Sequence, residues 1–223
     1  MGLTIHYTVK FKGTAQQLQD KLGIIRNKCL DLPFEEVGEV ICTEITQKHI
    51  NTFNFLQQKY SYPNNTEENL EIRNQIMQEM GVTISQIINL GVFHKQEPSI
   101  ILDLNLWPGE GCESCNLTFF KTKNQRIFRC GAFCKTQYAV NFVRCHLLVI
   151  KLMDLLKEEG FSVEVSDEGE YWETRDLSVL GKNINDYTDM ISSIFGQLKS
   201  ITKDNGMEVK SPITESKNYI RVK

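Results

Sequence analysis

Apolar and polar residues alternate at the very start of the chain. Between residues 3 and 11 every odd position is apolar or aromatic, and every even position is polar. A period of two residues is typical of a β-strand with one buried face. A similar alternation recurs at 100–106 and 161–165, and two further strands are predicted at roughly 115–121 and 125–133. The chain is therefore expected to build a sheet with one face against a core.

Helical patterns separate these predicted strands. Thr14 and Gln17 have the spacing of a capping box, and an apolar stripe of helical period follows them. Another strand is predicted from Val37 to Ile45, so the chain opens as β-α-β. The segment 142–159 is apolar on more than one side, which predicts a largely buried helix, and a last amphipathic helix is predicted at about 184–201.

This order of elements predicts an α+β fold. We expect a mixed or antiparallel sheet with helices packed on one face, and a ferredoxin-like βαβ opening is one form that it can take. A chain of 223 residues is long enough to bury a substantial core. We expect one domain over 1–202, which carries an Asn- and Gln-rich insertion at about 46–97, and a polar C-terminal tail at 203–223.

Composition narrows the classes of function. The formal net charge is -3 and no cluster of Lys and Arg is visible along the sequence, so a nucleic-acid partner is not expected. No apolar stretch approaches the ~20 residues that cross a bilayer, and the N-terminus has no signal pattern, so we expect no membrane partner and a cytoplasmic location. Seven cysteines, an odd number, favour reduced thiols over a disulfide framework.

The segment from Trp107 to Glu113 is denser in polar groups than a strand connection needs. Its two glycines let backbone amides approach a ligand, and two carboxylates flank the thiol of Cys112. A tight turn between strands explains the same residues, because Gly and Pro are common in turns.

A second dense segment runs from Phe133 to Tyr138, and His146 follows it on the predicted buried helix. A thiol becomes nucleophilic when a nearby cation or imidazole stabilises the thiolate, and both Lys135 and His146 are candidates to do this for Cys134. We expect Phe133 to be buried. The alternative for His146 is a hydrogen-bonded core histidine, since its helical face is apolar.

The third dense segment begins at Asp167, directly after a predicted strand. Four carboxylates fall within the seven residues 167–173, and their mutual repulsion raises at least one pKa unless a cation, a basic ligand or solvent separates them. Tyr171 and Trp172 are unusual in a solvated loop and suit the wall of a pocket. Arg175 is expected to pair with Glu173 or Asp176.

Zinc is a weaker alternative. Four cysteines have nearly the spacing of a four-thiolate site, although the second pair is separated by three residues. These residues are Cys112, Cys115, Cys130 and Cys134.

The sequence resembles an uncharacterised bacterial protein family of no assigned function. The matching stretches are Met1–Tyr7, Leu32–Phe34, Trp107–Glu113, Phe133–Ala139, Arg144–Leu147 and Asp167–Asp176, with the patterns W-P-G-x-G-C-E, F-C-K-T-Q-Y-A and D-E-G-x-Y-W-E. The resemblance implies a shared architecture and no particular reaction. It implies family thiols at Cys112 and Cys134, with Cys115 and Cys130 as departures, which counts against zinc.

The leading hypothesis is a small-molecule or peptide-binding protein. We expect the three segments to meet in one pocket open to water, of mixed acidic and aromatic character, that takes a cationic or hydroxyl-rich ligand. A divalent cation held by oxygens is compatible with it. The ligand-binding residues are predicted to be Trp107, Glu110, Cys112, Glu113, Lys135, Gln137, Tyr138, Tyr171, Trp172 and Glu173.

Two other classes of function remain open. In a cysteine-nucleophile hydrolase or transferase, Cys134 attacks, His146 is the base, and Asp167 or Glu168 orients the imidazole. In a protein-interaction module without pocket chemistry, the dense segments only shape a surface, and an exposed aromatic patch would favour this class. The sequence does not identify a cofactor, a ligand or an oligomeric state.

Overall fold

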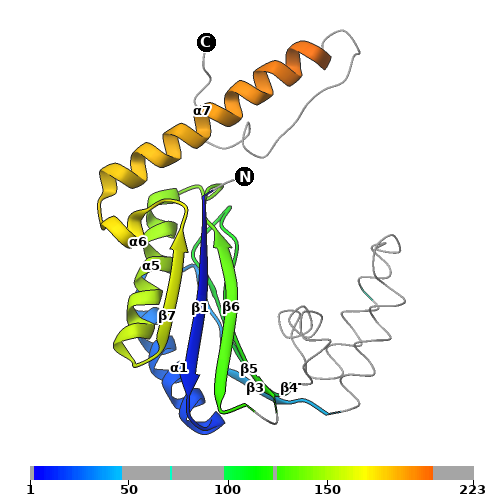
Figure 1. Ribbon diagram of the computed structural model, residues 1–223, viewed down its shortest axis with the longest axis vertical. Coiled ribbons are helices and arrows are strands. Elements are labelled where there is room, and N and C mark those ends of the chain that lie inside the picture. The colour runs from blue at the N-terminus through cyan, green and yellow to red at the C-terminus, as the bar shows by residue number, and fades with distance from the viewer. Residues whose placement is uncertain (1–2, 47–70, 72–97, 123–124, 203–223) are drawn as a thin grey trace.

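The computed structural model describes residues 3–46, 71, 98–122 and 125–202 (Figure 1). The predicted tail and almost all of the predicted insertion lie outside the described residues. The elements are β1 (Thr4–Lys12), α1 (Ala15–Leu30), β2 (Glu36–Val37), β3 (Ile41–Glu44), β4 (Pro98–Trp107), β5 (Cys115–Thr122), β6 (Ile127–Lys135), α5 (Phe142–Glu158), β7 (Ser162–Asp167), α6 (Tyr171–Thr174) and α7 (Leu177–Thr202).

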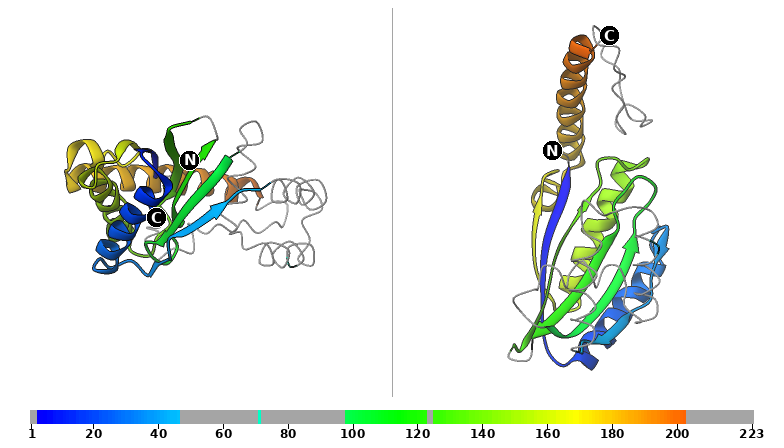
Figure 2. Two further views of the ribbon diagram at one scale, coloured as in Figure 1. Left: turned by 90° about the horizontal axis from the view of Figure 1, so that it is seen from below. Right: turned by 90° about the vertical axis from the view of Figure 1, so that its right-hand side faces the viewer.

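The strands form one sheet in the order β2-β4-β5-β6-β1-β7, with β3 also paired to β4. Every neighbouring pair is antiparallel. Helices α1 and α5 lie on the same face of this sheet (Figures 1 and 2). The predicted α+β class is therefore confirmed, with an antiparallel sheet and helices on one face.

Two helical crossovers organise the sheet. Helix α5 carries the chain from β6 to β7, which flank β1 and are parallel to each other because each is antiparallel to it. Helix α1 carries the chain from β1 to β2 and β3 near the opposite edge of the sheet, past β6, β5 and β4. The chain does open as β-α-β, but a ferredoxin-like sheet places one strand between the first two, whereas three lie between them here.

The alternation along β1 divides its residues between two environments. Ile5 and Val9 are fully buried and Tyr7 nearly so, whereas His6 is exposed. Each fully buried large aliphatic side chain contributes about 1.5–3 kcal/mol relative to an exposed one. The apolar face of β1 thereby fixes which side of the sheet the helices cover.

Helix α1 begins as the sequence predicts. The Thr14 hydroxyl accepts a hydrogen bond from the amide of Gln17 at 3.1 Å, and the Gln17 side chain accepts one from the amide of Thr14 at 2.9 Å. This reciprocal pair satisfies two backbone donors that a helix start leaves free. The apolar stripe of the helix then faces the core through Leu18, Leu22, Ile25 and Cys29.

The predicted strand at 37–45 is broken into β2 and β3. Three residues separate Val37 from Ile41, whereas two separate their partners Leu106 and Asp103 on β4. One extra residue on an edge strand is the geometry of a β-bulge. At the bulge, Gly38 lies so close to β4 that an added Cβ would be 3.0 Å from the carbonyl oxygen of residue 105.

Candidate functional site

The three dense segments meet at one end of the sheet. The amide of Glu113 donates to the carbonyl of Lys135 at 3.1 Å, which joins the 107–113 loop to the end of β6. The amide of Thr136 donates to the carbonyl of Leu3 and the amide of Glu168 to the carbonyl of Thr4, both at 3.2 Å. The start of β1 therefore links the segment after β6 to the acidic turn after β7.

His146 is the centre of a buried hydrogen-bond network at this end. Its Nδ1 atom lies 3.0 Å from the Thr136 hydroxyl, and its Nε2 atom lies 3.1 Å from Oδ2 of Asp167. An ionised carboxylate only accepts hydrogen bonds, so Nε2 donates its proton to Asp167, and the threonine hydroxyl is the partner of Nδ1. Both imidazole nitrogens are thus satisfied by protein groups.

Asp167 holds this network to the acidic turn. Its carboxylate also accepts from the amide of Gly169 at 2.8 Å and from the amide of Trp172 at 2.9 Å. Burial raises the pKa of Asp167, but the hydrogen bond and charge of His146 together with the two amides outweigh burial and hold the pKa below its ordinary value. The buried charge of Asp167 is therefore stabilised by three hydrogen bonds, one from His146 and two from backbone amides.

The predicted pocket at this convergence is sealed. The exposed fractions of Cys134 and His146 are both 0%, and that of Asp167 is 6%. The segments do come together, as expected, but their reactive groups do not line a cavity open to water. The physical reason is that β6, α5 and β7 all direct these side chains to the helix-covered face of the sheet.

The predicted nucleophile and base have other partners. The thiol of Cys134 donates to the carbonyl of Glu113 at 3.1 Å, while His146 uses both nitrogens in its own network. The neighbouring thiols Cys112 and Cys115, together with burial, raise the pKa of Cys134 well above its usual range. The arrangement therefore lacks an activated Cys134 thiolate with a free imidazole beside it. Glu168, the alternative orienting residue, accepts from the amide of Thr4 at 2.9 Å.

Thiols form a connected cluster behind the 107–113 loop. The sulfur atoms of Cys112 and Cys134 are 3.8 Å apart. Cys145, on the first turn of α5, also contacts the Cys112 thiol, and its sulfur donates to the carbonyl of Pro108 at 3.5 Å. On the other side, Cys115 contacts Cys134.

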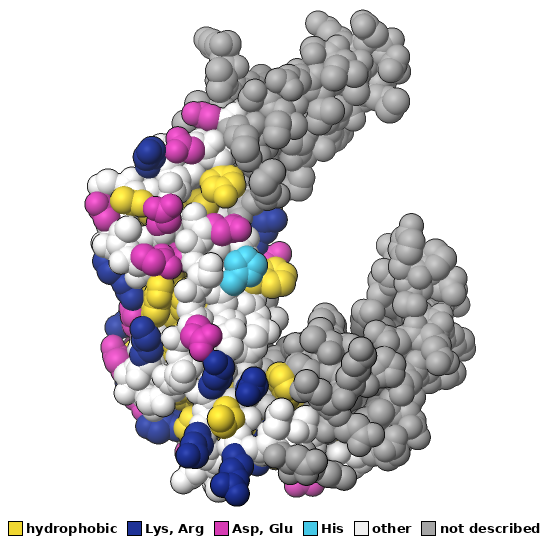
Figure 3. All heavy atoms as spheres, in the orientation of Figure 1, with side chains coloured by type: hydrophobic (Ala, Val, Ile, Leu, Met, Phe, Trp, Pro, Cys, Tyr) yellow, Lys and Arg dark blue, Asp and Glu magenta, His cyan; other side chains and the backbone are white. Residues whose placement is uncertain are grey.

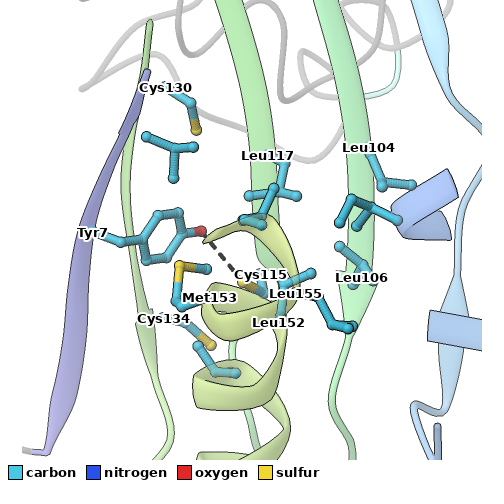
Figure 4. Close-up of a cluster of buried hydrophobic side chains, with 14 of the residues drawn as sticks. Tyr7, Leu104, Leu106, Cys115, Leu117, Cys130, Cys134, Leu152, Met153 and Leu155 are labelled. Carbon is cyan, nitrogen blue, oxygen red and sulfur yellow. Dashed lines mark hydrogen bonds between the residues drawn. The ribbon is translucent and has the colours of Figure 1, made fainter. Parts of the chain in front are cut away.

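The cluster continues to a buried phenol. The Cys115 sulfur lies 3.4 Å from the hydroxyl oxygen of Tyr7, and this hydroxyl donates to the carbonyl of Asn116 at 2.9 Å (Figure 4). Burial, together with the nearby Cys115, raises the pKa of Tyr7 well above its usual value. The sequence spacing grouped Cys112, Cys115, Cys130 and Cys134 as a candidate zinc site, but only the fold shows that Cys145 and Tyr7 belong to this cluster.

The predicted four-thiolate zinc site does not form. Cys130 and Cys134 are four residues apart on the same strand, which separates them by about 13 Å at the rise of a β-strand. The ring of Tyr7 lies between them in Figure 4. Zinc–sulfur bonds are about 2.3 Å long, so no single ion reaches both thiols. Within the described residues, no group of three or more His, Cys, Asp or Glu side chains has the geometry to hold a metal ion.

The aromatic residues of the acidic turn pack against helices. The Trp172 ring has the Lys157 ammonium 4.6 Å from its centre and the Arg175 guanidinium at the same distance. Arg175 pairs with Asp154 at 2.7 Å, and so the pairing predicted with Glu173 or Asp176 is wrong. Tyr171 and Trp172 are half-buried and packed against the core.

The remaining predicted ligand-binding residues have mostly local partners. The Trp107 indole donates to the carbonyl of Cys112 at 3.1 Å, and the Glu113 carboxylate accepts from the amide of Lys135 at 3.0 Å. The Lys135 ammonium lies 5.2 Å from the centre of the Tyr138 ring. Gln137 is buried, and its side-chain oxygen has no hydrogen-bond partner within the described residues, whereas Glu110 and Glu173 are exposed. These contacts fix the loop and strand end in place.

A shallow hollow lies on the outer face, by which we mean the face of β1, β6 and β7 opposite to α1 and α5. Its volume is about 510 Å³. It is lined by His6, Tyr7, Thr8, Gly131, Ala132, Phe133, Glu164, Val165 and Ser166.

The register of the strands orders the side chains of this face in three rows. The first row contains two aromatic rings, the second contains two small residues and an acid, and the third contains two cations. Written from β6 through β1 to β7, the rows are Phe133, His6 and Ser166; Gly131, Thr8 and Glu164; and Arg129, Lys10 and Ser162. Gly131 forms the floor of the hollow, because a Cβ added there would meet no atom within 4 Å.

Phe133 is on this outer face, which corrects the expectation that it is buried. Its exposed fraction is 55%, and its ring centre lies 5.8 Å from that of His6. The alternation along β6 directs Phe128, Cys130 and Cys134 to the core, and so Phe133 must point the other way. In the sequence, the signal for this outer-face site is the polar positions of β1 and the odd-numbered positions of β6. These positions can be recognised as one surface only when the pairing of the two strands is known.

The fold and surface define the chain as an α+β protein whose sheet presents an aromatic and basic outer face. Comparison with protein families, with curated proteins and with solved structures found no match. The resemblance to an uncharacterised bacterial family remains a prediction. In the part of the chain that the structure describes, no helix has the length and apolar character needed to cross a membrane.

Proposed function

We propose that this protein binds an extended acidic peptide segment on its outer face. One apolar side chain of the peptide fills the hollow above Gly131, against the rings of Phe133 and His6, and an acidic group of the peptide contacts Arg129. The observation that carries the proposal is the exposed Phe133 ring beside a hollow whose floor has no side chain.

Exposed aromatic surface beside a hollow supports an apolar anchor. Aromatic residues are enriched at protein interfaces, where a ring supplies contact area with little loss of conformational entropy. The hollow is shallow, so a small molecule bound there would keep much of its surface in water, whereas small-molecule sites bury most of the ligand. A peptide extends beyond the hollow and gains further contacts on the three strands.

Charge supports an acidic peptide. Figure 3 shows Lys and Arg side chains gathered at the lower end of this face, and acidic side chains further up. Lys12, Arg126 and Arg129 are exposed, and within the described residues Arg129 has no ion pair. Lys10 is partly neutralised by Glu164 at 2.6 Å. Of the two cations in the third row, Arg129 is therefore the one more available to a carboxylate.

The same charges argue against a nucleic acid. A nucleic acid carries a phosphate on every nucleotide, so a strand that crosses the hollow would bring phosphates close to Glu164. A peptide can instead place its apolar side chain in the hollow and its acidic group at Arg129. Nucleic-acid surfaces neutralise several phosphates with a basic face. The cationic ligand predicted from the acidic turn has less support, because Asp167 is buried and bonded to His146, and the Glu168 carboxylate accepts from the amide of Thr4. Glu173 is an exposed carboxylate of this turn.

Fluorescence anisotropy tests the proposal with three labelled probes. The first is a peptide of alternating aspartate and leucine, the second has lysine in place of each aspartate, and the third is an oligo-dT strand of similar length. We expect the acidic peptide alone to bind. Stronger binding of the lysine peptide or of oligo-dT would contradict the proposed chemistry.

Two variants locate the site, and a third is the control. Gly131→Leu fills the hollow and Arg129→Glu reverses the charge, and each should weaken binding of the acidic peptide about tenfold or more, a change of about 1.4 kcal/mol. Lys151→Glu makes the same charge change on α5, where the side chain is exposed, and should leave affinity within about twofold. Equal effects of Arg129→Glu and Lys151→Glu would exclude this face as the binding site.

A further inference from the structure

The pair Cys112 and Cys134 combines proximity with unequal access to solvent. Their sulfur atoms are 3.8 Å apart, and they come from a loop and from the end of β6. Cys112 has an exposed fraction of 9%, whereas Cys134 has none. A disulfide has a sulfur–sulfur distance of about 2.0 Å, so the two atoms need to approach by less than about 2 Å.

Local bonds hold the two cysteines side by side. The amide of Glu113 donates to the carbonyl of Lys135, and the amide of Lys135 donates to the Glu113 carboxylate. The residues that follow Cys112 and Cys134 are therefore joined by two hydrogen bonds. Because the backbone already holds the pair, closing a bond between the sulfurs requires mainly side-chain rotation.

We propose that Cys112 and Cys134 form a peroxide-sensitive thiol pair, in which a hydroperoxide oxidises Cys112 and Cys134 then closes a disulfide with it. This site is separate from the peptide-binding face and does not depend on it. The chemical class of the oxidant is a hydroperoxide small enough to reach a nearly buried sulfur, such as hydrogen peroxide.

The reaction balances in two steps. The thiolate of Cys112 attacks the outer oxygen of the hydroperoxide, the O–O bond breaks, and a sulfenic acid and an alcohol or water are formed. The sulfur of Cys134 then attacks the Cys112 sulfur and expels hydroxide, which leaves as water with the proton of Cys134. The two thiols lose two electrons in total, and the hydroperoxide gains them.

The surroundings select Cys112 as the sulfur that is oxidised first. When Cys112 ionises, the thiols of Cys134 and Cys145 can donate to its sulfur in place of the carbonyls of Glu113 and Pro108, and these hydrogen bonds lower the pKa of Cys112, although burial opposes them. The exposed thiol, Cys42, has its pKa raised by partial burial and by the nearby Glu44. Since the thiolate is the reactive form, Cys112 should react before Cys42 despite its lower exposure.

Mass spectrometry of the full chain tests the pair directly. The reduced protein is treated with hydrogen peroxide and its remaining thiols are blocked with N-ethylmaleimide at low pH. Cleavage after Glu113 separates Cys112 from Cys115, and cleavage after Phe133 separates Cys130 from Cys134. We expect a mass loss of about 2 Da, for two hydrogen atoms, and a linked peptide that contains Cys112 and Cys134.

This experiment uses the protein without substitutions, so its result does not depend on whether a variant folds. A disulfide from Cys112 to Cys145, or oxidation that begins at Cys42, would overturn the assignment, as would no disulfide at all. In Cys134→Ala, the sulfenic acid at Cys112 should persist and be trapped by dimedone. Cys29→Ala is the matched control and should leave the linked peptide unchanged.

Discussion

The Nε2 atom of His146 lies 3.1 Å from Oδ2 of Asp167, and both side chains are fully buried. Thr136 occupies the other imidazole nitrogen at 3.0 Å, so a hydroxyl, an imidazole and a carboxylate stand in line. This order resembles the hydrogen-bond chain of a hydrolase triad. Because none of the three is open to solvent, the network serves to join β6, α5 and β7.

Removing the carboxylate from this network should destabilise the fold. Asp167→Ala leaves the Nε2 proton and two backbone amides without their acceptor, at a cost of about 3 kcal/mol in the free energy of unfolding. Urea denaturation measures the loss. Glu173→Ala, an exposed position in the same segment, is the control and should change stability by less than about 0.5 kcal/mol. Similar stabilities of the two variants would contradict the structural role of Asp167.

Acid should weaken the protein through Asp167. The folded-state pKa of this group is lowered, so the unfolded state binds its proton more readily. Its contribution to stability is therefore fully present above the unfolded pKa of about 3.9 and is lost as the pH falls through the lowered folded pKa. The free energy of unfolding, measured from pH 6 to about pH 2.5, should fall less steeply in Asp167→Asn than in the unsubstituted protein. Parallel curves would show that another carboxylate dominates.

Two glycines should respond in opposite directions to alanine. A Cβ at Gly23, inside α1, meets no atom within 4 Å, so Gly23→Ala should raise the free energy of unfolding by about 0.5–1 kcal/mol. Gly111 has a φ of +76°, and a Cβ there would be 2.3 Å from the carbonyl oxygen of Tyr138. Gly111→Ala should therefore lower stability, and thermal denaturation of both variants compares them.

Two phenylalanines of β6 should differ in their contribution to stability. Phe128→Ala removes a fully buried ring and should cost about 3–5 kcal/mol, whereas Phe133→Ala removes a ring that is 55% exposed and should cost less than about 1 kcal/mol. Phe133→Ala should still weaken binding of the acidic peptide. A large loss of stability in Phe133→Ala would contradict its place on the outer face.

Several local features were predictable from the sequence. The capping box at Thr14, the two-residue period of β1 and the burial of α5 all follow from residues close together in the chain. The inward direction of His146 was also predictable, because its neighbours on the helical face are apolar. Hydrogen bonding and side-chain direction within one element depend on local geometry, which sequence periodicity records.

The tertiary structure decided how these elements meet. The sequence alone did not show that β1 lies between β6 and β7, and it therefore did not reveal that His6 and Phe133 share one surface. For the same reason Cys134 was expected at an open cavity, although it lies against Cys112 in the interior. Strand order and register are relations between distant segments, and they settle which polar groups are sealed in the core and which face water. A two-residue period shows which face of one strand is apolar, but only strand order and register decide which side chains of distant strands lie together on each face of the sheet.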